Sequence, residues 1–247
     1  MPVSETLIVA TLFFVGAALY ASVGHGGASS YLAVMGLFSF APNVMKPTAL
    51  ALNILVAAVA TFKFYRAGLF SWGRFWPFAI ASIPAAFAGG ATVLPGRWYK
   101  VLVGVVLLYA AAWMFRSALR PLTREIHSPP LWAAIIAGAG IGFLSGLTGV
   151  GGGIFLSPLL LYMGWAETRA TSGVAAPFIL VNSVAGLLGH LSSVAHLPPN
   201  ISMWGVAAVI GGWIGASYGS KKVPAPVLRQ LLSLVLIVAG AKLIFGS

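Results

Sequence analysis

The chain has 247 residues, of which 60% are hydrophobic and only 7% are charged, and its formal net charge is +11. A soluble domain carries roughly a quarter charged residues, so the composition excludes an ordinary soluble domain and predicts an all-α polytopic membrane protein. The chain has no cysteine, which excludes a disulfide framework and a thiolate metal site or nucleophile. In a soluble protein the excess of basic residues would indicate nucleic acid, but here they lie mostly between apolar segments, so no nucleic-acid partner is expected.

Ten apolar segments follow one another along the chain, and each is predicted to be a helix. They lie near residues 6–23, 28–38, 48–66, 74–94, 98–116, 131–147, 153–164, 170–190, 203–220 and 226–245. Most are close to the ~20 residues that a helix needs to cross a bilayer. Segments 28–38 and 153–164 are shorter and would reach only ~16–18 Å. Each short segment directly follows a glycine cluster, so a break is predicted before Ala28 and before Gly153.

The order of these segments repeats. When Gly24 is aligned with Gly149, Gly26 falls on Gly151 and Gly27 on Gly152, and KPTA (46–49) matches RATS (169–172) further on. Each half then contains a long segment, a glycine break, a short segment and three long segments. The sequence therefore predicts two transmembrane repeats, 1–120 and 121–247. An odd number of crossings per half gives the repeats inverted topology, with Gly-broken hairpins and short helices near the membrane midplane.

The basic residues predict the orientation in the membrane. With the N-terminus outside and each glycine break at the tip of a helical hairpin, loops 63–74, 116–130, 165–170 and 220–230 are cytoplasmic. These loops hold ten basic residues, Lys63, Arg66, Arg74, Arg116, Arg120, Arg124, Arg169, Lys221, Lys222 and Arg229. The outside keeps four, Lys46, Arg97, Lys100 and Lys242. This asymmetry supports the orientation, because cytoplasmic loops are enriched in Lys and Arg.

The clustered glycines are the first candidates for a substrate site. Glycine costs about 1 kcal/mol relative to alanine inside a helix, so the clusters should interrupt their helices and leave backbone N–H groups at two helix N-termini. Such ends bind anions. The candidate binding residues in the breaks are Gly24, His25, Gly26, Gly27, Gly149, Gly151, Gly152 and Gly153. The alternative is close helix packing, which is also the interpretation of the four-residue spacing of Gly138, Gly142 and Gly146 and of Gly211, Gly215 and Gly219.

Polar side chains in the apolar segments are few. The chain has no aspartate, and its three acids, Glu5, Glu125 and Glu167, lie near segment ends, which argues against a cation pathway and suits an anion. Hydroxyl and amide groups able to bond an oxyanion, or simply to join helices, are those of Thr48, Asn53, Thr171, Ser172, Asn182 and Ser183, and all of these except Ser183 are taken as candidate ligands. His25 is a candidate for proton coupling, with a neutral structural histidine as the alternative. Lys46 and Arg169 occupy matching positions and would either attract anions at the two mouths or be ordinary flanking charges.

The two halves, each with a G-x-G-G break followed by a short helix and a Thr-containing helix start (KPTALALN, RATSGVAAP), resemble the sulfite exporter TauE/SafE family of membrane permeases. The resemblance covers essentially the full length, and GLTGVGGGIFLSPLLL is its more specific motif. It implies transport of sulfur-containing oxyanions such as sulfite, sulfoacetate and other organosulfonates.

The predicted function is therefore a secondary transporter for a small sulfur-containing anion, working by alternating access and favouring export, in the cell membrane (the inner membrane of a Gram-negative cell). A passive anion channel of the same fold is the alternative. An intramembrane serine protease built on GASS (27–30) or GASY (215–218) is disfavoured because no buried acid exists to orient a histidine, although a Ser-His pair would not need one. No enzymatic activity, metal or cofactor is expected, and the partners are the anion, the lipid bilayer and a coupled proton.

Overall fold

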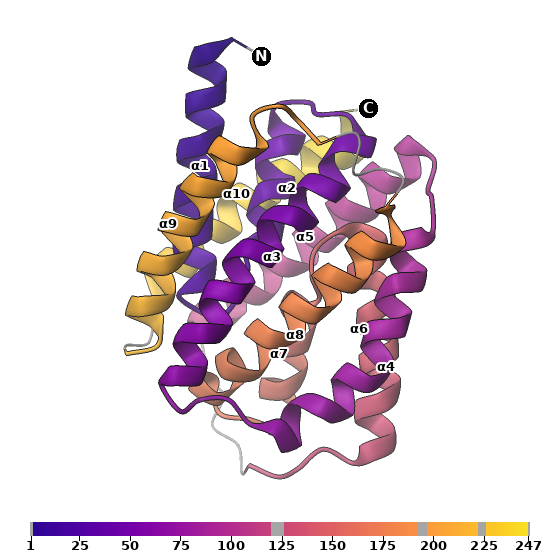
Figure 1. The fold of residues 1–247 in the computed structure, drawn as a ribbon, viewed down its shortest axis with the longest axis vertical. Coiled ribbons are helices and arrows are strands. Elements are labelled where there is room, and N and C mark those ends of the chain that lie inside the picture. The colour runs from indigo at the N-terminus through magenta and orange to yellow at the C-terminus, as the bar shows by residue number, and fades with distance from the viewer. Residues whose placement is uncertain (1, 120–125, 192–196, 222–225, 247) are drawn as a thin grey trace.

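The computed structural model describes residues 2–119, 126–191, 197–221 and 226–246, and across these residues it is built of helices joined by short connections. Figure 1 shows them as one bundle. In chain order they are α1 (Val3–Ala21), α2 (Ala28–Leu37), α3 (Pro42–Arg66), α4 (Trp72–Ala91), α5 (Gly96–Leu119), α6 (Leu131–Thr148), α7 (Gly153–Tyr162), α8 (Thr168–Gly189), α9 (Ile201–Gly219) and α10 (Pro226–Phe245). Each corresponds to one segment predicted from the apolar runs.

Six helices in the described part of the chain are long and apolar enough to cross a membrane, namely α1, α3, α5, α6, α8 and α9. Helices α2 and α7 have only ten residues each, as the sequence predicts. The prediction of an all-α polytopic membrane protein is therefore confirmed, and the chain is a multi-pass membrane protein.

The largest difference from the predicted bounds is the start of α3, which begins at Pro42 rather than near residue 48. Proline is favoured in the first turn of a helix, because its missing N–H would have no partner there. The charge of Lys46 interrupts the apolar run in the sequence. In the structure its ammonium group donates to the carbonyl oxygen of Gly90 at 2.8 Å, so the helix continues through a buried lysine.

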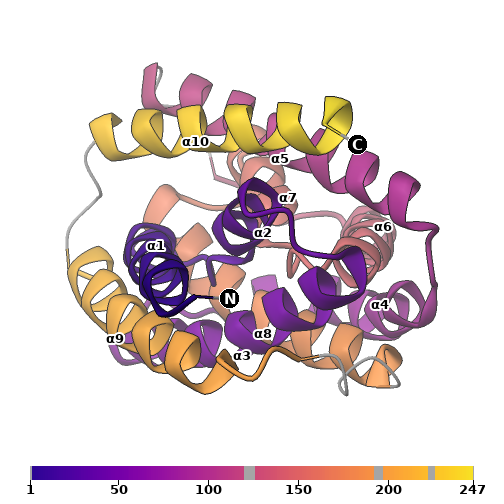
Figure 2. The same cartoon turned by 90° about the horizontal axis from the view of Figure 1, so that it is seen from above.

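The two halves interlock through matching helix pairs. Helix α4 packs along α6 and α9 packs along α1, while α4 also contacts α8 and α9 contacts α3. The pairs α3–α8 and α5–α10 join corresponding helices of the two halves. Seen from above, α1 lies beside α9 on one side of the bundle and α4 beside α6 on the other (Figure 2). Exchanging α1–α5 with α6–α10 thus preserves these main contacts, as a two-repeat chain requires. The boundary between residues 120 and 121 lies outside the described residues and stays a prediction.

The halves begin at opposite ends of the bundle. In Figure 1 both termini lie at one end, where α1 begins, whereas α6 begins at the other end, beside the α3–α4 connection. Inverted topology requires this arrangement, and the direction of the bundle in the membrane stays a prediction. Three of the predicted cytoplasmic basic residues, Arg120, Arg124 and Lys222, lie outside the described residues, and so does Glu125.

Two glycine stripes hold the interlocked helices together. A Cβ added to any of three α6 glycines would collide with backbone atoms of α4, and one added to any of three α9 glycines would collide with backbone atoms of α1 or of its C-cap residue. The pairs are Gly138 with Phe78, Gly142 with Ser82, Gly146 with Ala86, Gly211 with Phe14, Gly215 with Ala18 and Gly219 with Ser22. Membrane helices use small residues in this way because the backbones can then touch. The packing interpretation of these six glycines is confirmed.

Candidate functional site

Both predicted glycine breaks are present in the structure. Helix α1 ends at Ala21 and α2 begins at Ala28, while α6 ends at Thr148 and α7 begins at Gly153. The backbone is left-handed at Gly24 and Gly27 in the first break, and at Gly149, Gly151 and Gly152 in the second. Glycine adopts this conformation without the penalty of a Cβ. The caps of both short helices, Gly27 and Gly152, are left-handed glycines without a side-chain hydrogen bond.

Asn53 lies between the two breaks and contacts both. Its Oδ1 accepts a hydrogen bond from the N–H of Ala28 at 3.2 Å, and its Nδ2 donates to Ser183 Oγ at 2.9 Å. A Cβ on Gly26 would collide with Oδ1, and one on Gly151 would collide with Nδ2. Asn53 is fully buried and lies near the middle of α3, a helix long enough to cross the bilayer. The structure therefore brings the two breaks together in the interior, around one amide side chain.

The breaks leave hydrogen-bond donors unused. Among the described residues, the N–H groups of Gly26 and Gly27 in the first break, and those of Gly151 and Gly152 in the second, donate to no protein acceptor. Buried backbone N–H groups are almost always paired, and a helix N-terminus adds a partial positive charge of about half an elementary charge. Two such donor sets in the interior of a membrane protein favour a bound anion.

His25 joins the first break to the second short helix. Its Nε2 lies 3.1 Å from the carbonyl oxygen of Gly153 and 2.9 Å from Ser157 Oγ. A carbonyl oxygen only accepts, so a hydrogen bond to Gly153 requires a proton on Nε2, and in that tautomer a second proton would be taken by Nδ1. These contacts link the two halves through the imidazole, and His25 as a residue is half-buried.

The first glycine of each break, Gly24 and Gly149, packs against the N-terminal part of α8 and of α3, respectively. Gly24 packs so closely on Ser172 that a Cβ would lie 2.5 Å from its carbonyl oxygen, and Ser172 Oγ donates to the carbonyl of Val23 at 2.9 Å. Gly149 packs in a similar way on Lys46, at 3.2 Å from its carbonyl oxygen to the added Cβ. Each break is thus seated on a helix of the opposite half. Ser172, predicted as a ligand, uses its hydroxyl here to fix the first break.

The remaining predicted residues lie on α3 and α8. The Oγ1 atoms of Thr48 and Thr171 are buried and have no hydrogen-bond partner in the described part of the chain. Asn182 donates from Nδ2 to the carbonyl of Phe178 at 2.8 Å, and its buried Oδ1 has no partner among the described residues. The two threonines occupy matching positions in the halves, so each half contributes one buried hydroxyl able to donate. Their role as ligands stays a prediction.

Three residues at the site are absent from the predicted set, although each hydrogen-bonds to a break or to a side chain between the breaks. Ser157 bonds His25, Ser183 accepts from Asn53, and the hydroxyl of Tyr31 donates to the carbonyl of Gly26 at 3.0 Å. The position of Ser157 four residues after Gly153, on the same face of α7, is the one sequence signal that would have indicated it. Nothing in the spacing of Tyr31 or Ser183 distinguishes them from packing residues.

The matching cations Lys46 and Arg169 both lie against helix C-termini. Lys46 Nζ donates to the carbonyls of Gly90 and Thr92 at the end of α4, and Arg169 Nη2 donates to the carbonyl of Ser220, which caps α9, at 2.7 Å. Cations are favoured at helix C-termini. Lys242 binds the carbonyl of Leu37 at the end of α2 in the same way. Two of the four basic residues predicted on the outside are therefore explained as helix caps rather than loop charges.

Proteins similar to this chain match it over most of its length. The model of the sulfite exporter TauE/SafE family matches residues 8–243. A protein of Sinorhizobium fredii named probable membrane transporter protein y4hK is 44% identical over 98% of this chain and 99% of its own length. Probable membrane transporter protein YunE of Bacillus subtilis is 22% identical over 83% of this chain and 81% of its own, and MJ0441 of Methanocaldococcus jannaschii, with the same description, is 26% identical over 78% and 76%. No solved structure matches the chain.

Proposed function

The chain belongs to the sulfite exporter TauE/SafE family and is a membrane transporter, and from this premise we propose that it carries small sulfur-containing oxyanions. The substrate class is sulfite and organosulfonates such as sulfoacetate. The carrier works by alternating access between its two halves and exports its substrate.

One observation carries this proposal: the two glycine breaks meet at the buried side chain of Asn53, and in the described structure the backbone N–H groups of two glycines in each break donate to no protein acceptor. A sulfonate presents three oxygens, each able to accept hydrogen bonds, and carries its charge without needing a fixed cation beside it. Backbone donors and helix N-termini serve such a group in the same way as they serve phosphate. The described interior near the breaks contains no carboxylate, so nothing there repels an anion.

A side chain at the same place extends the donor set. Ser183 accepts from Asn53 and keeps its own hydroxyl proton for a substrate oxygen. We propose that the anion uses this hydroxyl together with the backbone N–H groups of both breaks. Contacts from both halves are what alternating access needs, because the substrate then stays bound while one half moves against the other.

His25 supplies the proposed coupling. It bridges the halves through Gly153 and Ser157, and a second proton on the imidazole would place a positive charge beside the anion. A proton taken up with the anion lowers the charge that crosses the membrane. In the absence of a proton, a potential that is negative inside favours anion exit by about 2.3 kcal/mol per charge per 100 mV.

Counterflow in proteoliposomes tests the proposal. Vesicles are loaded with unlabelled sulfite, sulfoacetate, taurine, sulfate or chloride, and uptake of trace labelled sulfite or sulfoacetate is followed, with protein-free vesicles as the control. Acceleration by internal sulfite or sulfonate, and none by chloride, is expected of a carrier with this substrate class. Uptake of tracer without acceleration from the opposite side would instead indicate a passive anion channel. No uptake of either tracer by folded protein would remove the substrate assignment.

A further inference from the structure

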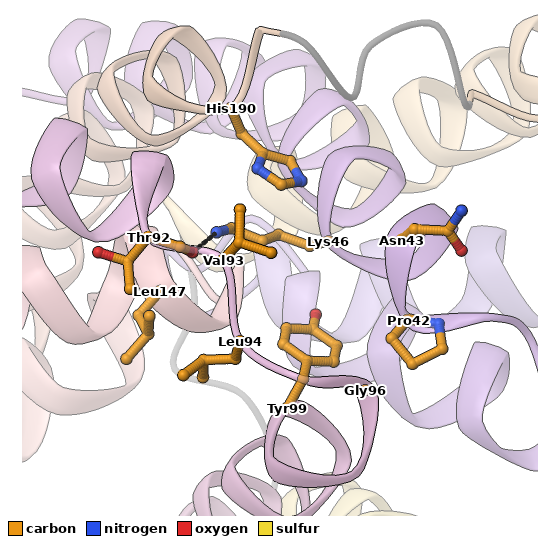
Figure 3. Close-up of a pocket in the computed structure, with 10 residues that line it drawn as sticks. All are labelled: Pro42, Asn43, Lys46, Thr92, Val93, Leu94, Gly96, Tyr99, Leu147 and His190. Atoms are coloured by element: carbon orange, nitrogen blue, oxygen red, sulfur yellow. Dashed lines mark hydrogen bonds between the residues drawn. The ribbon is translucent and has the colours of Figure 1, made fainter.

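A cavity of about 300 Å³ lies at the end of the bundle where both termini are found. Asn53 is not among its lining residues, and the cavity adjoins the second glycine break, because Gly149 packs on Lys46, which lines it. The start of α3, the α4–α5 connection, the first turn of α5 and the ends of α6 and α8 surround it. Figure 3 shows Lys46 and His190 on its walls, with Tyr99 on the opposite side. These elements come from both halves, so the cavity sits at a mouth of the interface between them.

Lys46 gives this cavity a positive charge without a carboxylate counterion. The residue is only 4% exposed, and its Nζ donates to the backbone carbonyls of Gly90 at 2.8 Å, Thr92 at 3.3 Å and Gly89 at 3.4 Å. In the part of the chain that the structure describes, no carboxylate pairs with this ammonium group. The C-terminus of α4 offers about half a negative charge, so a net positive charge remains. A buried charge is costly unless it is compensated, and an anion in the cavity would complete the compensation.

The other walls suit an anion with a short organic part. His190, 8% exposed, holds its imidazole over the cavity on the side facing Lys46, and the amide of Asn43 lies at the rim. The hydroxyl of Tyr99 is bonded to the carbonyl of Thr148 at 2.9 Å, which fixes the ring as a wall. Leu94 and Leu147 provide apolar surface opposite the polar groups. A sulfonate group would face Lys46 and His190, and its carbon chain would lie on the leucines.

We propose that this cavity is an outer oxyanion site, distinct from the site between the glycine breaks, where an organosulfonate binds at the mouth of the transporter. Lys46 supplies the charge, and His190 and Asn43 supply hydrogen bonds. The inference rests on the proposed function for the identity of the anion. Arg169, the counterpart of Lys46, caps α9 at the opposite end of the bundle through Ser220. The substitution Arg169→Gln is therefore a matched control, because it removes an equivalent helix cap and an equal charge.

The absence of cysteine from the natural chain allows a direct test with one reporter. Val93 lines the cavity and is 79% exposed, so Val93→Cys should react with a charged maleimide at the rim. The rate of maleimide labelling is measured on detergent-solubilised protein in a phosphate-free buffer. Samples with sulfoacetate are compared with samples that contain chloride at equal ionic strength instead. We expect sulfoacetate to slow labelling at least fivefold. The protection should disappear with Lys46→Gln, persist with Lys46→Arg, and persist with Arg169→Gln.

Several results would overturn the outer site. One is that sulfoacetate gives no protection in a preparation that shows counterflow. Another is that it protects Val93→Cys equally well after Lys46→Gln. A third is that Arg169→Gln also abolishes protection, which would mean that both substitutions act through a general loss of structure. A further arm adds phosphatidylglycerol micelles without sulfoacetate, because a lipid phosphate offers the same chemistry. Protection by the lipid and none by sulfoacetate would assign the cavity to a headgroup and refute the proposal. Protection by sulfoacetate without counterflow would support the site and refute the transport function.

Discussion

Gly151→Ala tests whether the second glycine break must approach Asn53 as closely as the structure shows. Gly151 has φ +84°, and an added Cβ would collide with Asn53 Nδ2 and lie 3.0 Å from Ser183 Oγ. The substitution therefore does two things at once. It places an L-residue in the left-handed region, and it pushes apart the Asn53–Ser183 hydrogen bond of 2.9 Å.

The expected magnitude follows from these two effects. A non-glycine residue in the left-handed region costs roughly 1–2 kcal/mol, part of which is offset because alanine also restricts the unfolded chain, leaving about 1 kcal/mol. Leaving a buried polar group unpaired costs about 1–3 kcal/mol. The free energy of unfolding should therefore fall by about 2–4 kcal/mol, and counterflow should be lost because the second break would be pushed away from Asn53 and from the first break.

Two other glycines separate these effects. Gly68 has φ +71° with nothing within 4 Å of an added Cβ, so Gly68→Ala should cost only the conformational part, about 1 kcal/mol. Gly140 lies inside α6 with open space around it, so Gly140→Ala should be neutral or stabilising by about 0.5–1 kcal/mol. Both variants should keep native counterflow.

The assay is the fraction of monodisperse protein that survives heating in detergent, measured by size-exclusion chromatography, together with sulfoacetate counterflow. From most to least stable, the expected order is Gly140→Ala, native protein, Gly68→Ala and Gly151→Ala. If Gly151→Ala were as stable and as active as Gly68→Ala, the close approach of the second break to Asn53 would contribute neither to stability nor to transport. That result would refute the role proposed for this contact.

Three further predictions concern single residues. Asn53→Ala should lower the free energy of unfolding by about 2–4 kcal/mol, because the buried N–H of Ala28 loses its acceptor; native heat resistance of this variant would contradict the capping role. His25→Gln should reduce counterflow less than tenfold but abolish the response of uptake to an imposed pH gradient, since exchange needs no net proton movement, and an unchanged response would exclude His25 as the coupling group. In intact cells, Ala67→Cys should react with an impermeant maleimide only after lysis and Val93→Cys before it, and the reverse pattern would invert the orientation.

Much of the scaffold follows from the sequence because its causes are local. Apolar runs of bilayer length define the long helices, and the glycine clusters place the starts of α2 at Ala28 and of α7 at Gly153. The four-residue glycine stripes also indicate close packing, since that spacing puts the residues on one helix face. The partners of each stripe do not follow, because the pairing of α4 with α6 and of α9 with α1 depends on the arrangement of the whole bundle.

The site is predicted less completely, because its geometry comes from contacts between distant segments. The structure brings the two predicted glycine breaks and Asn53 together in the interior, but the bond from His25 to Ser157, which spans 132 residues of sequence, could not be predicted. Lys46 illustrates the same point. From the sequence it is an anion-attracting or flanking charge, and only the fold shows that α4 ends against it. The sequence around Lys46 does not indicate this partner, because the partner is the end of a different helix.

The two halves repeat the scaffold without repeating the chemistry of the breaks. His25 aligns with Val150, and Asn53 aligns with Ala176 when KPTA is matched to RATS. Both aligned partners are buried and apolar, so the titratable imidazole and the bridging amide belong to the first half alone. In the site that we propose between the breaks, both halves offer backbone donors to the anion, whereas the coupled proton would come from His25 alone. A second histidine in place of Val150 would add another positive charge beside the anion and slow its release. The single imidazole therefore suits the proposed carrier, which must release its substrate as well as bind it.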